Sequence, residues 1–307
     1  MQTLPQETDA GESVEDSVSE IGKILEAGVD RGECTPAWAA SILDLIKESE
    51  VIKDRPGLYT ANIIHQSLRA EASKDGPPVS RIATMRAPDL GVGRNGGLSR
   101  IALPEELPES ISDFYELVER RHSTPMFGTE PLGLGELSAV LKASFGSKGF
   151  ERGYQRRDIP RRVAPSAGGL QSYDCQVIAN DVRGLFPGRY SYDPLTHELV
   201  LEESGDFRLP LLEASIESGF IVHAHSVIAI TGNFPRVSWK YGTRGYRYMG
   251  MDAGIVIGHV YLAATALGLS VNAVAAFADD KANQLLRLDG TTEFTQILIT
   301  LGTSPGS

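Results

Sequence analysis

The chain has 307 residues, a hydrophobic content of 41% and a formal net charge of −11. This length and apolar content are enough for a globular protein with one large domain and a smaller one, and the negative charge argues against a protein that coats nucleic acid or binds an anionic membrane surface. No window reaches the roughly 18 or more uninterrupted apolar residues of a membrane span, and the N-terminus lacks the basic and apolar segments of a signal peptide, so we expect a cytoplasmic protein.

The negative charge is concentrated at the N-terminus, where residues 1–50 hold 12 acidic and three basic side chains. Residues 1–13 are polar without an apolar period and are predicted to be a disordered tail. Residues 14–107 are predicted to be a helical region followed by a linker. Apolar residues there recur at helical spacing, a Thr-Pro pair at 35–36 is typical of a helix start, and residues 74–99 are rich in Gly and Pro. The main domain then spans residues 108–307.

The main domain shows mixed helices and strands. The sequence predicts helices at 112–121, 136–144 and 250–268, and strands at 175–179, 226–231 and 294–301. Turn signals within residues 187–200 predict a hairpin. Because the alternation is irregular and lacks the βαβ rhythm of a doubly wound sheet, we predict an α+β fold.

Cysteine and histidine spacing indicates no metal site. Cys34 and Cys175 lie far apart without CxxC spacing, so we expect neither a disulfide framework nor zinc. His223 and His225 alternate on a strand-like run but have no further ligand residues nearby in the sequence.

The first segment whose side chains could bind a ligand is Arg120-Arg121-His122-Ser123, at the end of a predicted helix. Two guanidiniums, an imidazole and a hydroxyl in consecutive positions are donors suited to a phosphate group. A solvated helix end explains the same residues equally well, because cations are favoured at helix C-termini.

The second segment is a run of small residues, Pro165-Ser166-Ala167-Gly168-Gly169. Such a run lets the backbone approach a flat ligand closely and offers amide donors. A simple connecting turn is the alternative. The spacing matches neither the dinucleotide-binding GxGxxG motif nor the P-loop.

The third segment contains Lys240 beside Tyr241. An ammonium close to a phenol favours the phenolate, so the pair could act as a base near neutral pH. Neighbours on a strand would face opposite ways, so joint action requires a turn, which Gly242 permits. An amphipathic loop with a packed tyrosine is the alternative.

The predicted helix that follows is almost wholly apolar and rich in Gly and Ala. Small residues indicate close packing against another helix, and a dimer interface is one such arrangement. Asp252 and His259 are seven residues apart and share a face, and we interpret His259 as a core residue with satisfied hydrogen bonds.

Read in order, these segments over Ser110–Gly302 resemble the nitroreductase superfamily, and more narrowly its SagB/ThcOx-type azoline dehydrogenases of thiazole/oxazole-modified peptide biosynthesis. The resemblance implies a nitroreductase-like FMN-binding fold, here with an N-terminal helical extension. It implies cofactor contacts from RRHSTPMF, from the PSAG-like stretch and from the later VNAVAAFADD block, namely Arg120, Arg121, His122, Ser123, Pro165, Ser166, Ala167, Gly168, Gly169, Ala275 and Ala276.

The resemblance also implies a function. Lys240 and Tyr241 match the catalytic pair of the azoline oxidases, which oxidise peptide thiazolines or oxazolines to thiazoles or oxazoles with FMN and, as final acceptor, oxygen. An azoline-containing peptide, a second copy in a homodimer, and a cyclodehydratase or other biosynthetic subunit are the partners it implies. An NAD(P)H-dependent nitro or quinone reductase, a flavin-free scaffold subunit and an oxidase of carrier-bound thiazolines remain as alternatives.

Overall fold

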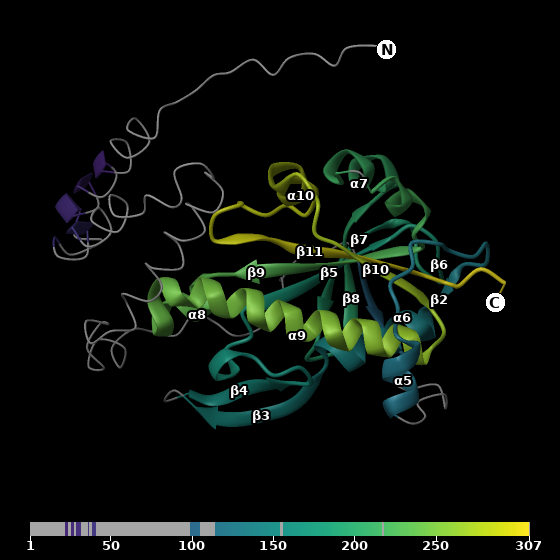
Figure 1. Ribbon diagram of the computed structural model, residues 1–307. Coiled ribbons are helices and arrows are strands. Elements are labelled where there is room, and N and C mark those ends of the chain that lie inside the picture. The colour runs from purple at the N-terminus through teal and green to yellow at the C-terminus, as the bar shows by residue number, and fades with distance from the viewer. Residues whose placement is uncertain are drawn as a thin grey trace, which may run out of the picture. The chain divides into compact units, whose positions relative to one another are not determined.

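Figure 1 shows the computed structural model of the chain, which describes residues 99–104, 114–153, 156–216 and 218–306 and a few positions between residues 22 and 40. The chain divides into two compact units, Met1–Pro78 and Val79–Ser307. In the first unit the described positions are helical apart from a turn at Arg31, as expected for that stretch. The predicted tail at residues 1–13 lies outside the described residues.

The second unit is built on a seven-stranded sheet in the order β1-β8-β7-β5-β9-β11-β10. All six strand pairings in it are antiparallel. Its strands are β1 (Ser99–Ala102), β5 (Tyr173–Ala179), β7 (Gly188–Asp193), β8 (Glu198–Ser204), β9 (Ser226–Asn233), β10 (Ser270–Val274) and β11 (Glu293–Gly302).

Two small pairings accompany this sheet. A short parallel pair joins β2 (Leu132–Gly133) to β6 (Val182–Arg183), and β3 (Ser147–Gly153) and β4 (Arg156–Arg162) form a separate antiparallel hairpin. The helices are α5 (Phe114–Arg120), α6 (Leu134–Phe145), α7 (Arg208–Ala214), α8 (Pro235–Tyr241), α9 (Gly245–Ala266) and α10 (Asp279–Leu285), with 3₁₀ turns at Ala167–Gly169, Gly219–His223 and Gly242–Arg244.

Helices cover both faces of the sheet, with α6, α8 and α9 on one side and α7 and α10 on the other (Figure 1). Neighbouring strand residues therefore enter different cores: Val177 packs in the cluster that contains α6 and α9, and Ile178 packs in the cluster that contains α7 and α10. Burial on both faces explains why the central strands are almost continuously apolar although they are antiparallel. The predicted α+β class is confirmed.

The predicted elements are present, with different limits in places. The helix predicted at 250–268 begins at Gly245, and the hairpin predicted within 187–200 is formed by β7 and β8. One boundary differs: Ser99–Ala102, assigned by sequence to the linker before residue 108, forms β1 and pairs with β8. Its four residues are too few to show a period, so only pairing with β8 reveals the strand.

The central helix α9 belongs to this core. Among the described residues, the stretch Pro235–Ala266 is long and apolar enough to cross a membrane, with a mean hydropathy of 1.2. Core helices pass the same criterion, and Val256, Val260 and Ala264 of α9 are fully buried in the cluster formed with α6 and the sheet.

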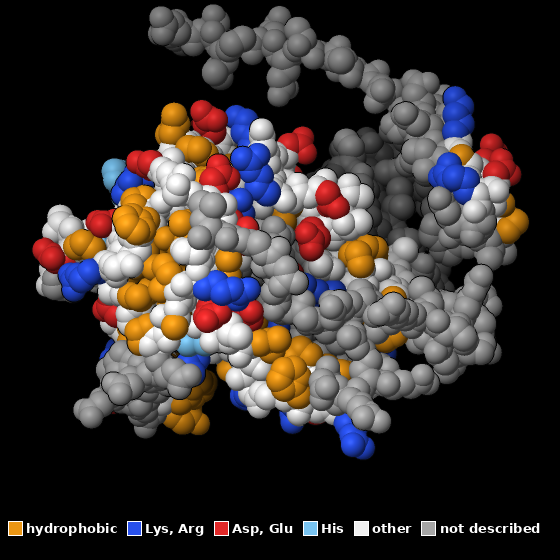
Figure 2. Space-filling model, turned by 180° about the vertical axis from the view of Figure 1, so that it is seen from behind, with side chains coloured by type: hydrophobic (Ala, Val, Ile, Leu, Met, Phe, Trp, Pro, Cys, Tyr) orange, Lys and Arg blue, Asp and Glu red, His pale blue; other side chains and the backbone are white. Residues whose placement is uncertain are grey.

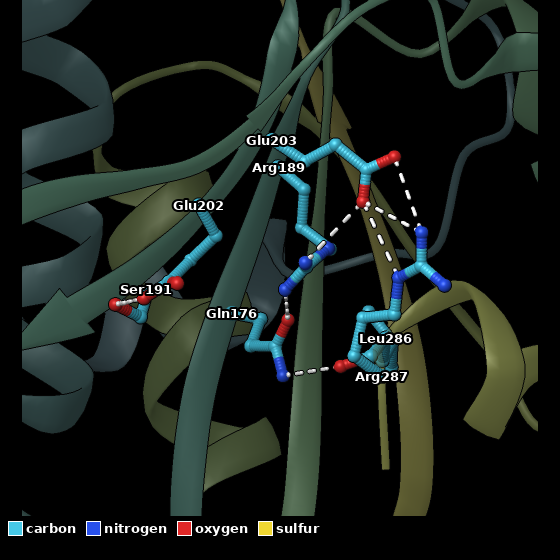
Figure 3. Close-up of polar contacts among 7 residues, drawn as sticks. All are labelled: Gln176, Arg189, Ser191, Glu202, Glu203, Leu286 and Arg287. Atoms are coloured by element: carbon cyan, nitrogen blue, oxygen red, sulfur yellow. Dashed lines mark hydrogen bonds and ion pairs between the residues drawn. The ribbon is translucent and has the colours of Figure 1, made fainter. Parts of the chain in front are cut away.

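A polar network supports the opposite face of the sheet (Figure 3). The buried Arg189 guanidinium donates to Gln176 Oε1 at 3.0 Å and pairs with Glu203 at 3.5 Å. Gln176 Nε2 donates to the Leu286 carbonyl at 3.0 Å, and the exposed Arg287 also pairs with Glu203. This network fastens the end of α10 to β5, β7 and β8.

Figure 2 shows the molecule from behind, where acidic, basic and apolar side chains are interspersed.

Candidate functional site

The first candidate segment gathers around Tyr261 of α9. Ser123 Oγ lies 2.9 Å from Tyr261 Oη, and the Arg121 guanidinium lies 5.7 Å from the centre of the Tyr261 ring. Arg120 donates to the Thr265 carbonyl at 3.5 Å, and His122 Nδ1 lies 2.8 Å from the Arg120 carbonyl. Arg120, Arg121 and Ser123 therefore contact the C-terminal half of α9, and His122 contacts the backbone of Arg120.

These donors suit an anionic group. Arg120, Arg121 and His122 are exposed at the end of α5. Within the described part of the chain, neither arginine lies within ion-pair distance of a carboxylate. Exposed guanidiniums without a carboxylate partner keep their fork-shaped donors available for a phosphate.

The end of β10 joins the same group. Tyr261 Oη accepts a hydrogen bond from Ala273 N–H at 2.8 Å, and Thr124 N–H donates to the Val271 carbonyl at 2.9 Å. Ala275 and Ala276 follow directly after β10 and are exposed. Tyr261 thus links the segment that begins at Arg120 with the strand that leads to these two alanines.

The second segment, Pro165–Gly169, is a tight turn held by Asp252 of α9. Its glycines have positive φ, 60° at Gly168 and 69° at Gly169, a conformation that side chains with a Cβ adopt at a cost. Asp252 Oδ1 accepts from Ala167 N–H at 2.9 Å, and Oδ2 accepts from Ser172 Oγ–H at 2.7 Å. Burial raises the pKa of the Asp252 carboxyl, and the hydrogen bonds from Ser172 and Ala167 act in the opposite direction.

The third segment lies at the C-terminal end of α8. Pro235 stands at the start of this helix, where its missing N–H is no loss, and Gly242 ends it with a φ of 57°. The half-buried Lys240 places its Nζ 4.8 Å from the centre of the Tyr241 ring. Tyr241 in turn packs edge-to-face on Tyr248 of α9, with ring centres 4.9 Å apart. Lys240 and Tyr241 are therefore in contact, at a helix end rather than on a strand.

A buried arginine fastens α8 to the chain that leaves the second segment. Arg236 Nη1 donates to the carbonyl of Gln171 at 3.2 Å, and its two Nη atoms contact the two carboxylate oxygens of Asp174 at 2.8 and 2.7 Å. The bidentate geometry fixes the orientation of both side chains. Arg236 therefore connects the helix that carries Lys240 and Tyr241 to the chain that follows the small-residue turn.

The structure unites two of the three segments and separates the other. Tyr248 and Asp252 are one helical turn apart, so the Lys240–Tyr241 pair and the small-residue turn contact the same flank of α9. Tyr261 lies nine residues beyond Asp252, a displacement of about 13 Å along the axis and about half a turn around it. The segment at Arg120–Ser123 therefore contacts the opposite flank of α9.

Four residues that build this arrangement were not assigned a role from sequence: Arg236, Tyr248, Asp252 and Tyr261. Tyr248, Asp252 and Tyr261 share one signal, a polar group on the mostly apolar helix α9, which a hydrophobic pattern alone leaves unexplained. His259, by contrast, fits its interpretation as a satisfied residue, because its Nδ1 lies 3.0 Å from the Ala143 carbonyl of α6. Over the described residues, no group of three or more His, Cys, Asp or Glu side chains is placed to hold a metal ion.

Comparison with known proteins gives the family. The nitroreductase family model matches residues 118–303. A protein of Methanocaldococcus jannaschii assigned to the nitroreductases is 34% identical over 209 residues, which cover 67% of this chain and 98% of that protein.

Two solved structures share the fold. One is a protein of Anabaena variabilis assigned to the nitroreductases, with a TM-score of 0.59 and 24% identity over 79% of this chain, which spans about half (48%) of the Anabaena chain. The other is a chain of the E. coli microcin synthetase McbBCD complex with truncated pro-MccB17 bound, with a TM-score of 0.53 and 20% identity over 76% of this chain and 85% of that one. The matched residues 118–303 contain all three candidate segments, and we conclude that the chain belongs to the nitroreductase family of flavin-dependent oxidoreductases.

Proposed function

We propose that this chain is an FMN-dependent azoline dehydrogenase that converts thiazolines or oxazolines in a peptide into thiazoles or oxazoles. The observation that carries the proposal is the contact between Lys240 and Tyr241 beside the small-residue turn, both on one flank of α9. Simple flavin reduction needs no protein base, whereas azoline oxidation removes a proton from carbon.

The chain's donor groups fit FMN. Arg120, Arg121, His122 and Ser123 would bind its phosphate and ribityl chain, and the turn at Pro165–Gly169 would lie along the flat ring, with Ala275 and Ala276 as further contacts. Because the two groups contact opposite flanks of α9 in one chain, a single FMN would contact both only in the homodimer proposed below. When bound, FMN supplies the two-electron acceptor, and dioxygen is the final oxidant. The exposed, carboxylate-free guanidiniums support the phosphate assignment, and the positive-φ glycines support close approach of a planar group.

The reaction removes two hydrogens from the azoline ring. A proton leaves the α-carbon, which is acidified by the ring C=N and the adjacent carbonyl, and a hydride leaves the β-carbon. In this proposal Tyr241 first releases its phenolic proton to solvent, and the Lys240 ammonium stabilises the negative charge of the resulting phenolate. The phenolate oxygen then accepts the α-proton, while the hydride passes to bound FMN. The fold holds the pair in place through Arg236 and Tyr248, so little motion is needed to align the base.

The peptide substrate and biosynthetic partners belong to the same proposal. The fold shared with a chain of the microcin synthetase McbBCD complex, which was solved with truncated pro-MccB17 bound, supports a peptide-borne substrate and association with a cyclodehydratase or another biosynthetic subunit. Thiazoline and oxazoline both present the acidic α-hydrogen that this chemistry requires.

An exposed face of α9 supports a homodimer. Gly250, Gly254 and Gly258 recur every fourth residue, and a Cβ added at any of them would meet nothing within 4 Å. Met251 and Ile255 lie between them and are 60% and 39% exposed. An apolar helix face without side-chain bulk allows a second copy of the helix to approach closely. A second copy packed there would border both flanks of α9, and therefore both groups of candidate cofactor residues.

The proposal is tested with purified protein, a synthetic thiazoline peptide and mass spectrometry, because each ring oxidation lowers the substrate mass by two hydrogens. Tyr241→Phe and Lys240→Ala should each reduce azole formation by about 10²- to 10⁴-fold, the usual contribution of a general base, while the flavin absorption of the purified protein stays unchanged. Tyr246→Phe is the matched control, since Tyr246 is exposed on the same stretch and packs near Phe294. Wild-type rates in both dyad variants would refute the assignment.

A second function is favoured by the relative from Methanocaldococcus jannaschii. An NAD(P)H-dependent nitro or quinone reductase would use the same scaffold without the base. It predicts rapid anaerobic bleaching of the flavin by NAD(P)H, unaffected by Tyr241→Phe. Slow bleaching together with rapid azoline oxidation would favour the dehydrogenase.

A further inference from the structure

The hairpin formed by β3 and β4 is a basic segment in an acidic protein. Residues 147–162 hold six basic and two acidic side chains, a net charge of +4, whereas the whole chain carries −11. A local charge opposite to that of the remaining surface attracts ligands that the rest of the protein repels. The hairpin is therefore suited to an acidic ligand.

The strand β3 is open to solvent. Residues 148–152, five in succession, are exposed. Successive side chains of a strand point to opposite faces, so both faces of β3 are accessible. Among the described residues, β3 and β4 form a two-stranded sheet of their own, so the edge of β3 that faces away from β4 has no partner strand there. An edge of this kind can receive an extended segment of another chain.

The side chains exposed on β3 suit an acidic peptide. In the part of the chain that the structure describes, neither Lys148 nor Arg152 lies within ion-pair distance of a carboxylate. Phe150 lies between them in the strand and is 58% exposed. Aromatic and arginine side chains are enriched in the surfaces by which proteins bind one another. Arg161, by contrast, pairs with Glu151 at 3.4 Å, so we assign it no contact with the ligand.

The base of the hairpin is held next to the small-residue turn. Ile159 and Pro160 of β4 are buried, and Val163 N–H donates to the Gly146 carbonyl at 2.8 Å. Two residues separate the end of β4 from the turn at Pro165–Gly169, a span of at most about 11 Å of extended chain. Figure 1 shows the hairpin on the same side of the sheet as α8 and α9. A peptide that lies along β3 therefore ends close to the candidate site.

We propose that β3 binds an extended, acidic segment of the peptide substrate, with Lys148 and Arg152 facing its carboxylates and Phe150 contacting an apolar side chain. The inference rests on the proposed azoline dehydrogenase function, because it names a part of the substrate outside the reacting ring. Lys148 and Arg152 are at most about 13 Å apart along the strand, so the segment is about four residues long. It stands about three or more residues from the azoline, because an extended peptide advances about 3.3 Å per residue.

Steady-state kinetics with two synthetic thiazoline peptides test the proposal. The peptides differ only in three consecutive residues near the ring, which are all glutamate in one peptide and all glutamine in the other. In wild type the acidic peptide should have a KM about 10-fold lower, the effect of two or three exposed charge contacts, with kcat unchanged. The difference should shrink as the salt concentration rises to about 0.5 M, because salt screens exposed charges.

Charge reversal on β3 should remove this preference. Lys148→Glu/Arg152→Glu changes two exposed side chains, so the fold should be retained. The matched control is Lys281→Glu/Arg183→Glu, which makes the same change in charge at exposed residues of α10 and β6 and should keep the wild-type preference. The same KM ratio in both double variants would overturn the inference.

Fluorescence anisotropy with labelled peptides that lack the azoline separates this inference from the proposed function. Tighter binding of the acidic peptide, lost in Lys148→Glu/Arg152→Glu, supports the surface even if the protein forms no azole. Azole formation with equal KM for the two peptides would overturn the inference and leave the proposed function intact. Equal displacement of the acidic peptide by an oligothymidylate of the same charge would also overturn it, because the surface would then bind any polyanion.

Discussion

Removal of the Asp252 carboxylate should loosen the small-residue turn and destabilise the whole domain. Asp252→Ala deletes two hydrogen bonds to a buried carboxylate, from Ala167 N–H at 2.9 Å and from Ser172 Oγ at 2.7 Å. Hydrogen bonds to charged groups contribute about 1.5–3 kcal/mol each. Relief of the carboxylate's burial offsets part of that sum, so we expect the free energy of unfolding to fall by about 2–4 kcal/mol.

Urea unfolding followed by circular dichroism measures this loss, with the m-value as a check that the denatured state is unchanged. Ser172→Ala removes one of the two bonds and should lie between wild type and Asp252→Ala. FMN affinity, measured by fluorescence titration, should fall in the same order if the turn holds the flavin. A free energy of unfolding for Asp252→Ala within about 0.5 kcal/mol of wild type, the range of ordinary surface substitutions, would refute the reasoning.

Three further outcomes are expected. Burial raises the pKa of Asp252 above its value in the unfolded chain, so protonation of this carboxyl stabilises the folded state as the pH falls. Asp252→Asn cannot gain this stability. In urea titrations, the stability of the variant relative to wild type should therefore be highest near about pH 7 and decline towards about pH 4. Gly146→Ala should lower the free energy of unfolding by about 1–3 kcal/mol, because a Cβ on this residue, which follows the last residue of α6, would overlap the Lys142 carbonyl oxygen. Gly135→Ala inside α6 meets nothing within 4 Å and should be neutral or slightly stabilising, and equal effects of the two variants in thermal melts would contradict this. Gly254→Leu should shift a dimer to monomer in sedimentation experiments without loss of helicity, and an unchanged sedimentation coefficient would exclude α9 as the interface.

Local patterns in the sequence were sufficient to predict much of the fold. The central strands and α9 are long apolar runs, and burial on both faces of the sheet preserves that signal. The sequence predicts the start of α9 at residue 250, five residues after its actual start at Gly245. The structure shows a packing reason for Gly245, since a Cβ there would lie 2.9 Å from Val237 Cγ2 of α8. Only the tertiary contact between the two helices reveals that this glycine is helical.

The sequence predicted which segments form the candidate site but not how these segments are placed around α9. Residue chemistry singled out Arg120–Ser123, the small-residue turn and the Lys240–Tyr241 pair. Which flank of α9 each segment contacts depends on Asp252 and Tyr261, whose partners lie 12 to 138 positions away along the chain. It also depends on Tyr248, whose partner Tyr241 is near in sequence but lies on a different helix. A pattern that reads neighbours within one or two helical turns contains no information on such pairings.

The attachment of every candidate segment to one helix has a consequence for how this sequence can change. Insertion of one residue between Asp252 and Tyr261 would turn the rest of α9 by about 100° and advance it by about 1.5 Å. Tyr261 would then leave Ser123 and Ala273, and the two groups of candidate residues would lose their relative positions. Insertions in the surface loops between strands carry no such penalty. Among functional relatives, length variation should therefore be tolerated between elements and absent from residues 248–265.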